Sequence, residues 1–319
     1  MNSSGILLGQ LICVFYLCGT GAAMAAFQAA PETDRLKQAE YSKVPDVEEQ
    51  DFTRMSDPRP GEWLSQFPEA GQSLETYKSR DSRILRTPTR HTIVLQPLGE
   101  FTDSQKKLLD ALREYAQVYF QMPCRVARPM ALPEPDRRLE NDSRQFDATK
   151  LVNKLLLPKL PKDAVIYIGI TMEDLYAENL NYVFGFGSFE NRTGVYSLAR
   201  YFPEFWGQPA NELSEQVVRR RAFKVLNHEA SHVFGLRHCI FYNCTMNGSN
   251  SLEEADSISL HECPICHQKL LWNLKFEPQR RFDALRILYA KYGLEDESAW
   301  IAKRSEHWKQ IHDPSRKKR

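Results

Sequence analysis

The stretch that decides the fold reads His228-Glu229-Ala230-Ser231-His232-Val233-Phe234-Gly235-Leu236-Arg237-His238. Its first two histidines are four residues apart, so a helix would place both imidazoles on one face, where they can bind the same ion. Gly235 allows the chain to turn out of that helix, and His238 can then return as a third nitrogen ligand. Three histidines leave the fourth tetrahedral position to water, with Glu229 beside it as a general base. This spacing predicts a catalytic zinc site.

Four of the seven cysteines follow this motif closely, at Cys239, Cys244, Cys263 and Cys266. Their spacing, C-x4-C-x18-C-x2-C, is that of a closed four-cysteine zinc site. Two disulfides or a redox pair at the C-x-x-C turn are the alternatives, although no thioredoxin-like strand precedes that turn. We expect a structural zinc here, and hence two zinc ions per chain. Because His238 and Cys239 are adjacent, the closed site would fix the third ligand of the open one.

The two motifs together, with Met246 two residues after Cys244, resemble the signature of the archaemetzincins, a branch of the metzincin metallopeptidases. Weaker similarity extends over 165–176, 182–185 and 197–201. The resemblance implies a metzincin-like zincin fold in which Met246 forms the turn beneath the metal. It also implies a zinc-dependent peptidase acting on peptides or proteins, as an aminopeptidase or an endopeptidase.

Hydrophobic periodicity gives the fold class independently of this resemblance. The sequence predicts strands over 91–95 and 164–170, and two β-prone stretches around 190–193 that fit a hairpin or an edge strand with its neighbour. It also predicts helices over 102–120, 146–157, 211–234 and 282–292. This order indicates an α/β fold of the α+β kind, with a mixed sheet, packed helices and a small C-terminal lobe tied by the four cysteines. Above the zinc, Gly194–Leu198 is the candidate edge strand for binding an extended peptide.

The net charge of this chain does not indicate a binding partner. Its 319 residues include 42 Lys and Arg against 41 Asp and Glu, a formal net charge of +1. Because the positive and negative charges nearly cancel, the chain has no overall positive potential that would attract nucleic acid, so we expect no nucleic-acid partner. We also expect a monomer.

The composition divides the chain into four parts. Residues 1–27 form an apolar leader, 28–90 a polar and proline-bearing arm that we expect to be loosely ordered, 91–300 the metallopeptidase domain with its second zinc site within 239–266, and 301–319 a basic C-terminal tail. The leader fits a secretory signal with an A-x-A cleavage pattern at 23–25, a weak membrane anchor, or an unstructured extension of a cytosolic enzyme.

Localisation has two competing expectations. The resemblance to archaemetzincins and the unpaired cysteines favour the cytoplasm, whereas residues 1–25 would direct secretion if they act as a signal peptide. Asn141 and Asn191 begin glycosylation sequons, a pattern too short to decide the matter.

Two functions from other classes compete with the peptidase. A zinc-stabilised scaffold would keep both metal sites without turnover, although the intact Glu229 argues against that interpretation. A redox protein built on Cys263 and Cys266 is the more remote alternative. His261 and His267 flank the cysteines, but four thiolates already complete a tetrahedron, so we assign these histidines no ligand role.

Overall fold

A five-stranded mixed sheet forms the core of the computed structural model, which describes residues 30–79, 86–138, 143–177, 180–188, 190–209 and 211–312. The strands are ordered β2-β1-β5-β8-β7. Their bounds are Thr92–Leu98 for β1, Cys124–Val126 for β2, Ala164–Thr171 for β5, Gly185–Ser188 for β7 and Thr193–Ser197 for β8. Strands β2, β1, β5 and β8 run parallel to one another, and β7 pairs antiparallel with β8 to form one edge of the sheet.

Helices cover both faces of this sheet, which explains why β5 is an unbroken apolar run whose residues are all buried. On one face, Ile93 and Leu95 share a core with α5 (Asp103–Phe120) and α7 (Glu212–Val233). On the other, Val94 packs with the segment formed by α6 (Ala148–Lys150) and a π-helical turn at Leu151–Leu156. The predicted mixed α/β class is therefore confirmed.

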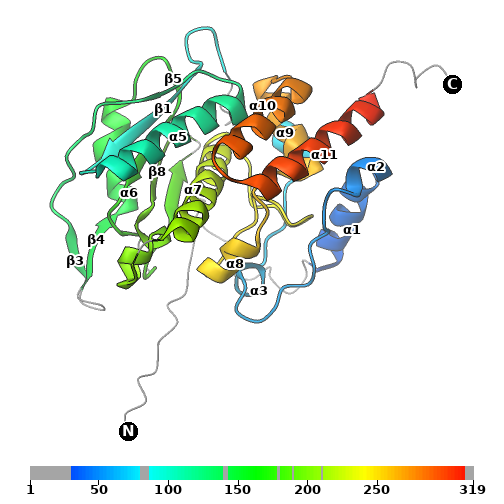
Figure 1. The fold of residues 1–319 in the computed structure, drawn as a ribbon. Coiled ribbons are helices and arrows are strands. Elements are labelled where there is room, and N and C mark those ends of the chain that lie inside the picture. Colours follow the sequence, from blue (N-terminus) through cyan, green and yellow to red (C-terminus); the bar gives the residue numbers. More distant parts are fainter. Residues whose placement is uncertain are drawn as a thin grey trace.

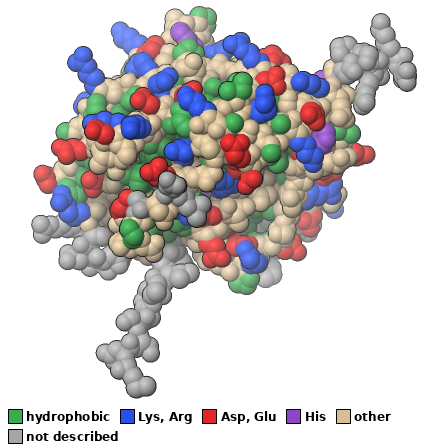
Figure 2. Space-filling view, in the orientation of Figure 1, with side chains coloured by type: hydrophobic (Ala, Val, Ile, Leu, Met, Phe, Trp, Pro, Cys, Tyr) green, Lys and Arg blue, Asp and Glu red, His purple; other side chains and the backbone are tan. Residues whose placement is uncertain are grey.

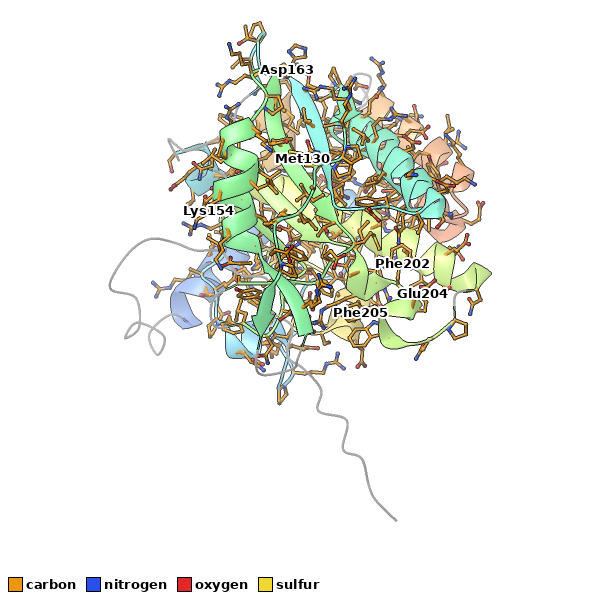
Figure 3. All side chains as sticks on the ribbon, turned by 90° about the vertical axis from the view of Figure 1, so that its left-hand side faces the viewer. Met130, Lys154, Asp163, Phe202, Glu204 and Phe205 are labelled. Atoms are coloured by element: carbon orange, nitrogen blue, oxygen red, sulfur yellow. The ribbon has the colours of Figure 1, made fainter. Side chains whose placement is uncertain are left out.

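The carboxyl ends of the parallel strands lie on one side of the molecule. Asp163 precedes β5 at the top of Figure 3, whereas Phe202 and Phe205, which follow β8, lie at the bottom. Two 3-10 turns occupy this side, at Ala199–Tyr201 and Pro203–Trp206. Another 3-10 turn covers Leu157–Lys159.

Helix α7 is the centre of the molecule. In Figure 1 it lies between the sheet with α5 and α6 on the left and the C-terminal helices and the N-terminal arm on the right. Its N-terminus is capped by Asn211, whose side chain accepts a hydrogen bond from the Ser214 amide at 2.8 Å. It ends before Gly235, which has φ +91° and so turns the chain away in a conformation that glycine adopts without strain. The predicted helix over 211–234 is thus confirmed to within one residue at each end.

A small ribbon and four C-terminal helices complete the fold. The ribbon contains β3 (Asp136–Arg138), β4 (Ser143–Asp147) and β6 (Leu175–Tyr176). The helices are α8 (Leu252–Ser257), α9 (Pro264–Leu274), α10 (Pro278–Lys291) and α11 (Glu295–His312). Helices α10 and α11 pack against each other, and α10 also contacts α5.

The edge strand differs from our expectation. Strand β8 lies between β5 and β7, so Gly194 is internal and β7 is the edge strand at that side of the sheet. The antiparallel pairing of the two β-prone stretches is confirmed, but their alternation does not reveal which one joins the parallel sheet.

The N-terminal arm is ordered where the structure describes it, contrary to the prediction for 28–90. It forms α1 (Ala30–Tyr41), α2 (Asp46–Glu49), α3 (Trp63–Gln66) and α4 (Leu74–Lys78). Single aromatic side chains anchor it. The Tyr41 hydroxyl donates to the Phe241 carbonyl at 2.6 Å, and the Tyr77 hydroxyl donates to the Phe234 carbonyl at 2.8 Å. Helices α2, α3 and α4 are too short to produce a periodic pattern. The two carbonyl groups that anchor Tyr41 and Tyr77 lie 200 and 157 residues away in sequence.

The C-terminal boundary is also corrected, because α11 continues through residues assigned to the basic tail. Arg304 is buried and pairs with Glu48 of α2, so α11 is tied to the arm. The predicted leader at 1–27 and the sequon asparagine Asn141 lie outside the described residues. Among the described helices, none has the length and apolar character needed to cross a bilayer. Figure 2 shows acidic and basic side chains interspersed over one face.

Candidate active site

Three histidines converge at the end of α7. His228 and His232 come from the helix and His238 from the turn after Gly235, and one ring nitrogen of each lies within 4.8 Å of the others. All three side chains are buried. The structure therefore brings together the three residues that the motif singled out.

Hydrogen bonds at Nδ1 orient the two helical histidines. His228 Nδ1 lies 2.8 Å from the Thr245 carbonyl, and His232 Nδ1 lies 2.6 Å from the Leu236 carbonyl. A carbonyl can only accept, so each Nδ1 carries the proton and each neutral ring presents a lone pair at Nε2. The two Nε2 atoms are 2.8 Å apart. Two facing lone pairs repel unless a cation lies between them, so this geometry fits a metal ion.

Burial keeps these rings neutral, which is the form that binds metal. It lowers the pKa of His228 to about 3, aided by the nearby His238, and it lowers the pKa of His232 well below the ordinary histidine value. Two imidazoles that stay uncharged over the neutral pH range are poised to donate to zinc rather than to bind protons.

Glu69 holds the third histidine, and sequence analysis missed it. Its Oε1 lies 2.6 Å from His238 Nδ1 and accepts a second hydrogen bond from Trp63 Nε1 at 2.6 Å. Burial would raise the pKa of Glu69, but the attraction and hydrogen bond of His238 and the bond from Trp63 outweigh it and lower that pKa. The residue lies in the arm, 169 positions before its partner, and no motif marks it.

Glu229 lies against the edge strand. It is 1% exposed, and a Cβ placed on Gly185 of β7 would come within 2.5 Å of its carboxylate. Only a residue without a side chain lets the strand pass this close to the carboxylate. Gly187, on the same side of β7, has its nearest such contact at 3.5 Å, from Val233.

The four clustered cysteines also come together. Their sulfurs lie within 4.8 Å of one another, and all four side chains are buried. Cys239 and Cys263 have sulfurs 3.6 Å apart, close to the ~3.8 Å separation that Zn–S bonds of about 2.3 Å give in a tetrahedron and far beyond a disulfide of about 2.05 Å. The geometry fits a metal cage rather than the disulfide alternative.

The pKa values of these thiols also favour a metal cage. Burial raises the pKa of Cys244 and Cys263 well above the ordinary thiol value. Burial also opposes ionisation of Cys239, but hydrogen bonds from the three other thiols outweigh it and lower that pKa well below the ordinary value. Of these three thiols the cage by itself favours ionisation only of Cys239, whereas a divalent ion bound by the cysteines would favour the thiolate form of each of its ligands.

The turn after Gly235 joins the two clusters. The Cys239 amide donates to the Met246 carbonyl at 2.8 Å, and the Asn247 side chain donates to the Cys239 carbonyl at 2.8 Å. Met246 is fully buried in this turn, directly after Thr245, whose carbonyl orients His228.

The two histidines flanking the cysteines have other partners. His261 Nε2 lies 2.6 Å from a Glu297 carboxylate oxygen, and His267 Nδ1 lies 3.0 Å from a Glu262 carboxylate oxygen. Neither belongs to the two clusters found among the described residues, as expected.

Comparisons with known proteins agree with this arrangement. The model of the family described as Peptidase family M54 matches residues 101–271. Archaemetzincin-2 of Homo sapiens is 31% identical over 257 residues, covering 71% of each chain. The archaemetzincin of Methanocaldococcus jannaschii is 36% identical over 179 residues, covering 56% of this chain and 92% of its own.

The chain belongs to peptidase family M54. A crystal structure of archaemetzincin from Methanopyrus kandleri is 28% identical, with a TM-score of 0.48, and covers 60% of this chain and 99% of its own. Membership of family M54 makes the protein a zinc metallopeptidase, a hydrolase whose substrates are peptides.

Glu69→Gln should weaken zinc binding at the histidine cluster by about 10- to 100-fold, because an amide does not strengthen the His238 imidazole as a carboxylate does. Competition with a chromophoric chelator measures the dissociation constant. Glu75→Gln, on the same arm but with a side chain that is 67% exposed, is the matched control and should bind zinc like the parent. Equal zinc affinity in all three proteins would exclude a role for Glu69.

Proposed function

We propose that His228, His232 and His238 hold the catalytic zinc of this peptidase and that Glu229 is its general base. The observation that carries this assignment is the convergence of three ring nitrogens, with the two helical rings fixed at Nδ1 by backbone carbonyls. Such a ligand set leaves one coordination position for the reaction. Zinc bound there supplies a Lewis acid that polarises the scissile carbonyl and acidifies water.

Glu229 accepts the proton of the attacking water at its carboxylate and later delivers it to the leaving amine. Its neighbour in sequence, His228, is a proposed ligand, so the base and the metal are held by the same turn of helix. Burial of the carboxylate excludes bulk water and strengthens its interaction with the substrate.

The edge strand β7 binds the substrate in this proposal. An extended peptide can add to the free side of an edge strand through main-chain hydrogen bonds. Because Gly185 of β7 lies against Glu229, a peptide on that edge passes close to the base.

The cysteine cage holds a second, structural zinc. Four thiolates complete the coordination of the ion, so this zinc has no position for substrate. Its function is to fix the turn that carries His238, which is covalently joined to Cys239.

The proposed base is tested by Glu229→Gln. The amide keeps the shape of the side chain and removes the proton acceptor, so peptide hydrolysis should fall by about 10²–10⁴-fold. Zinc content and thermal stability, measured on the same samples, should stay close to those of the parent. Parent-like hydrolysis by the variant would refute the assignment, and a zinc-loaded parent that cleaves no member of a diverse peptide library would favour the scaffold.

Gly185→Ala should show how far peptide hydrolysis depends on the position of Glu229, because this substitution leaves the carboxylate itself unchanged. The added methyl group must displace the flexible carboxylate, and a misplacement of about 1 Å costs on the order of 10²-fold in rate. Gly187→Ala is the matched control, since its methyl group meets Val233 at an ordinary contact distance. Peptidase assays should show a large loss in the first variant and little in the second, and equal rates would contradict the proposed role of this contact.

Metal analysis should find two zinc ions per chain after purification under reducing conditions. A chelator should remove one readily, because the histidine site keeps an open position, and the other slowly, because the thiolate cage is closed. Replacing Cys263 and Cys266 by serine should abolish the slow fraction. One zinc per chain, unaffected by that double substitution, would refute the two-site model.

A further inference from the structure

A small cavity lies beside the histidine cluster, and His228 and Glu229 are among the residues that line it. Its volume is about 40 Å³. A water molecule needs about 10–15 Å³ on this measure, so the cavity holds about three or four heavy atoms, the size of a short side chain. Phe184, Val225 and Ile258 form much of its apolar wall.

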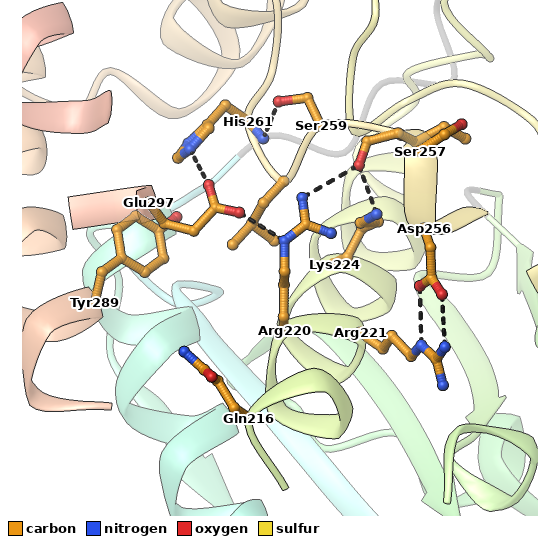
Figure 4. A network of polar contacts seen from close by, with 12 residues as sticks. Gln216, Arg220, Arg221, Lys224, Asp256, Ser257, Ser259, His261, Tyr289 and Glu297 are labelled. Carbon is orange, nitrogen blue, oxygen red and sulfur yellow. Dashed lines mark hydrogen bonds and ion pairs between the residues drawn. The ribbon is translucent and has the colours of Figure 1, made fainter. Parts of the chain in front are cut away.

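Charged side chains from α7 and α8 also line this cavity, namely Arg221, Lys224 and Asp256, and Figure 4 shows their polar contacts. The Arg221 guanidinium pairs with both carboxylate oxygens of Asp256, at 2.9 and 2.5 Å. Arg220, one residue earlier on α7, pairs with Glu297 of α11 at 2.7 Å. These two cations therefore have carboxylate partners.

Lys224 differs from both arginines. Its ammonium group donates to the carbonyls of Ala255 and Ile258, at 2.5 and 2.6 Å, and both residues also line the cavity. An ammonium has three hydrogens, so two carbonyls leave one for a ligand. The side chain is buried, and neutral acceptors compensate a buried positive charge less well than a carboxylate does.

We propose that this cavity selects a carboxylate, carried by a short acidic side chain next to the scissile bond, and that Lys224 is the specificity-determining residue. The inference rests on the proposed function, because it takes Glu229 and the histidines as the reacting groups beside the cavity. Burial makes an uncompensated cation costly. A carboxylate bound here therefore stabilises the Lys224 ammonium through a charge-assisted hydrogen bond. The apolar wall admits the aliphatic part of the side chain, and the volume excludes large residues.

A peptide series with Asp, Asn, Leu or Lys at each position flanking the cleaved bond tests the proposal on the zinc-loaded full chain. At one position, kcat/KM for Asp should exceed that for Asn by at least about tenfold, the usual effect of a hydrogen bond to a charged group. A second series with free and amidated C-termini separates a side-chain carboxylate from a terminal one. Equal or faster cleavage of the Asn and Leu peptides at every position would overturn the inference while leaving the peptidase assignment intact.

Substitution of the lysine identifies its role. Lys224→Met keeps the aliphatic stem and should abolish the preference for Asp, whereas Lys224→Arg should retain part of it. Lys154→Met is the control, because Lys154 is exposed and lies on the helical segment at the left of Figure 3. Thermal stability and zinc content distinguish a specificity change from misfolding. A preference that survives in a folded, zinc-loaded Lys224→Met protein would overturn the role of Lys224.

Binding provides a readout that does not depend on turnover. Calorimetry with zinc-loaded Glu229→Gln protein should show the Asp peptide binding about tenfold more tightly than its Asn counterpart. If the parent cleaves nothing but this preference is present, the proposed function fails and the carboxylate site stands. Equal binding of the two peptides would overturn the site.

Discussion

The rest of the structure depends on one peptide bond, the bond between His238 and Cys239. It makes a histidine of one donor cluster and a thiol of the other consecutive residues, so neither cluster can move without the other. Asn247 reinforces the connection, since its side chain bonds the backbone of Cys239, Tyr242 and Cys244. A catalytic metal site needs ligands that hold their positions while the metal coordination changes. In the proposed function, the four-cysteine site supplies that rigidity to a turn that lacks regular secondary structure.

The arm completes the site from the opposite end of the sequence. Trp63 packs edge-on against the His238 ring, with ring centroids 5.1 Å apart, and its indole N–H shares the Glu69 carboxylate with that ring. This arm precedes the residues matched by the family model. The M54 part of the chain therefore supplies the donors, and the preceding segment supplies a carboxylate that orients one of them.

Sequence analysis located what depends on local spacing. The i, i+4 histidines, the turn at Gly235 and the cysteine pattern identified both clusters, and hydrophobic periodicity located α7 closely. It did not find Glu69, because a carboxylate that acts through a contact 169 residues away leaves no periodic or spacing signal. The arm helices were missed for a related reason: they are short, and a few aromatic side chains with distant partners hold them. The pairing of β7 with β8 was predicted, but the prediction of which strand forms the edge was wrong, because alternation along a strand does not reveal its neighbours.

The distribution of these residues along the chain has a consequence during biosynthesis. When His238 leaves the ribosome, Cys263 and Cys266 are still to be synthesised, and so is α11, which clamps the arm through Arg304 and Glu48. The nascent polypeptide thus carries all three histidines before it has the thiols that fix the third one. In the proposed function, the histidine site therefore gains its supporting cage only after the chain has been synthesised as far as Cys266.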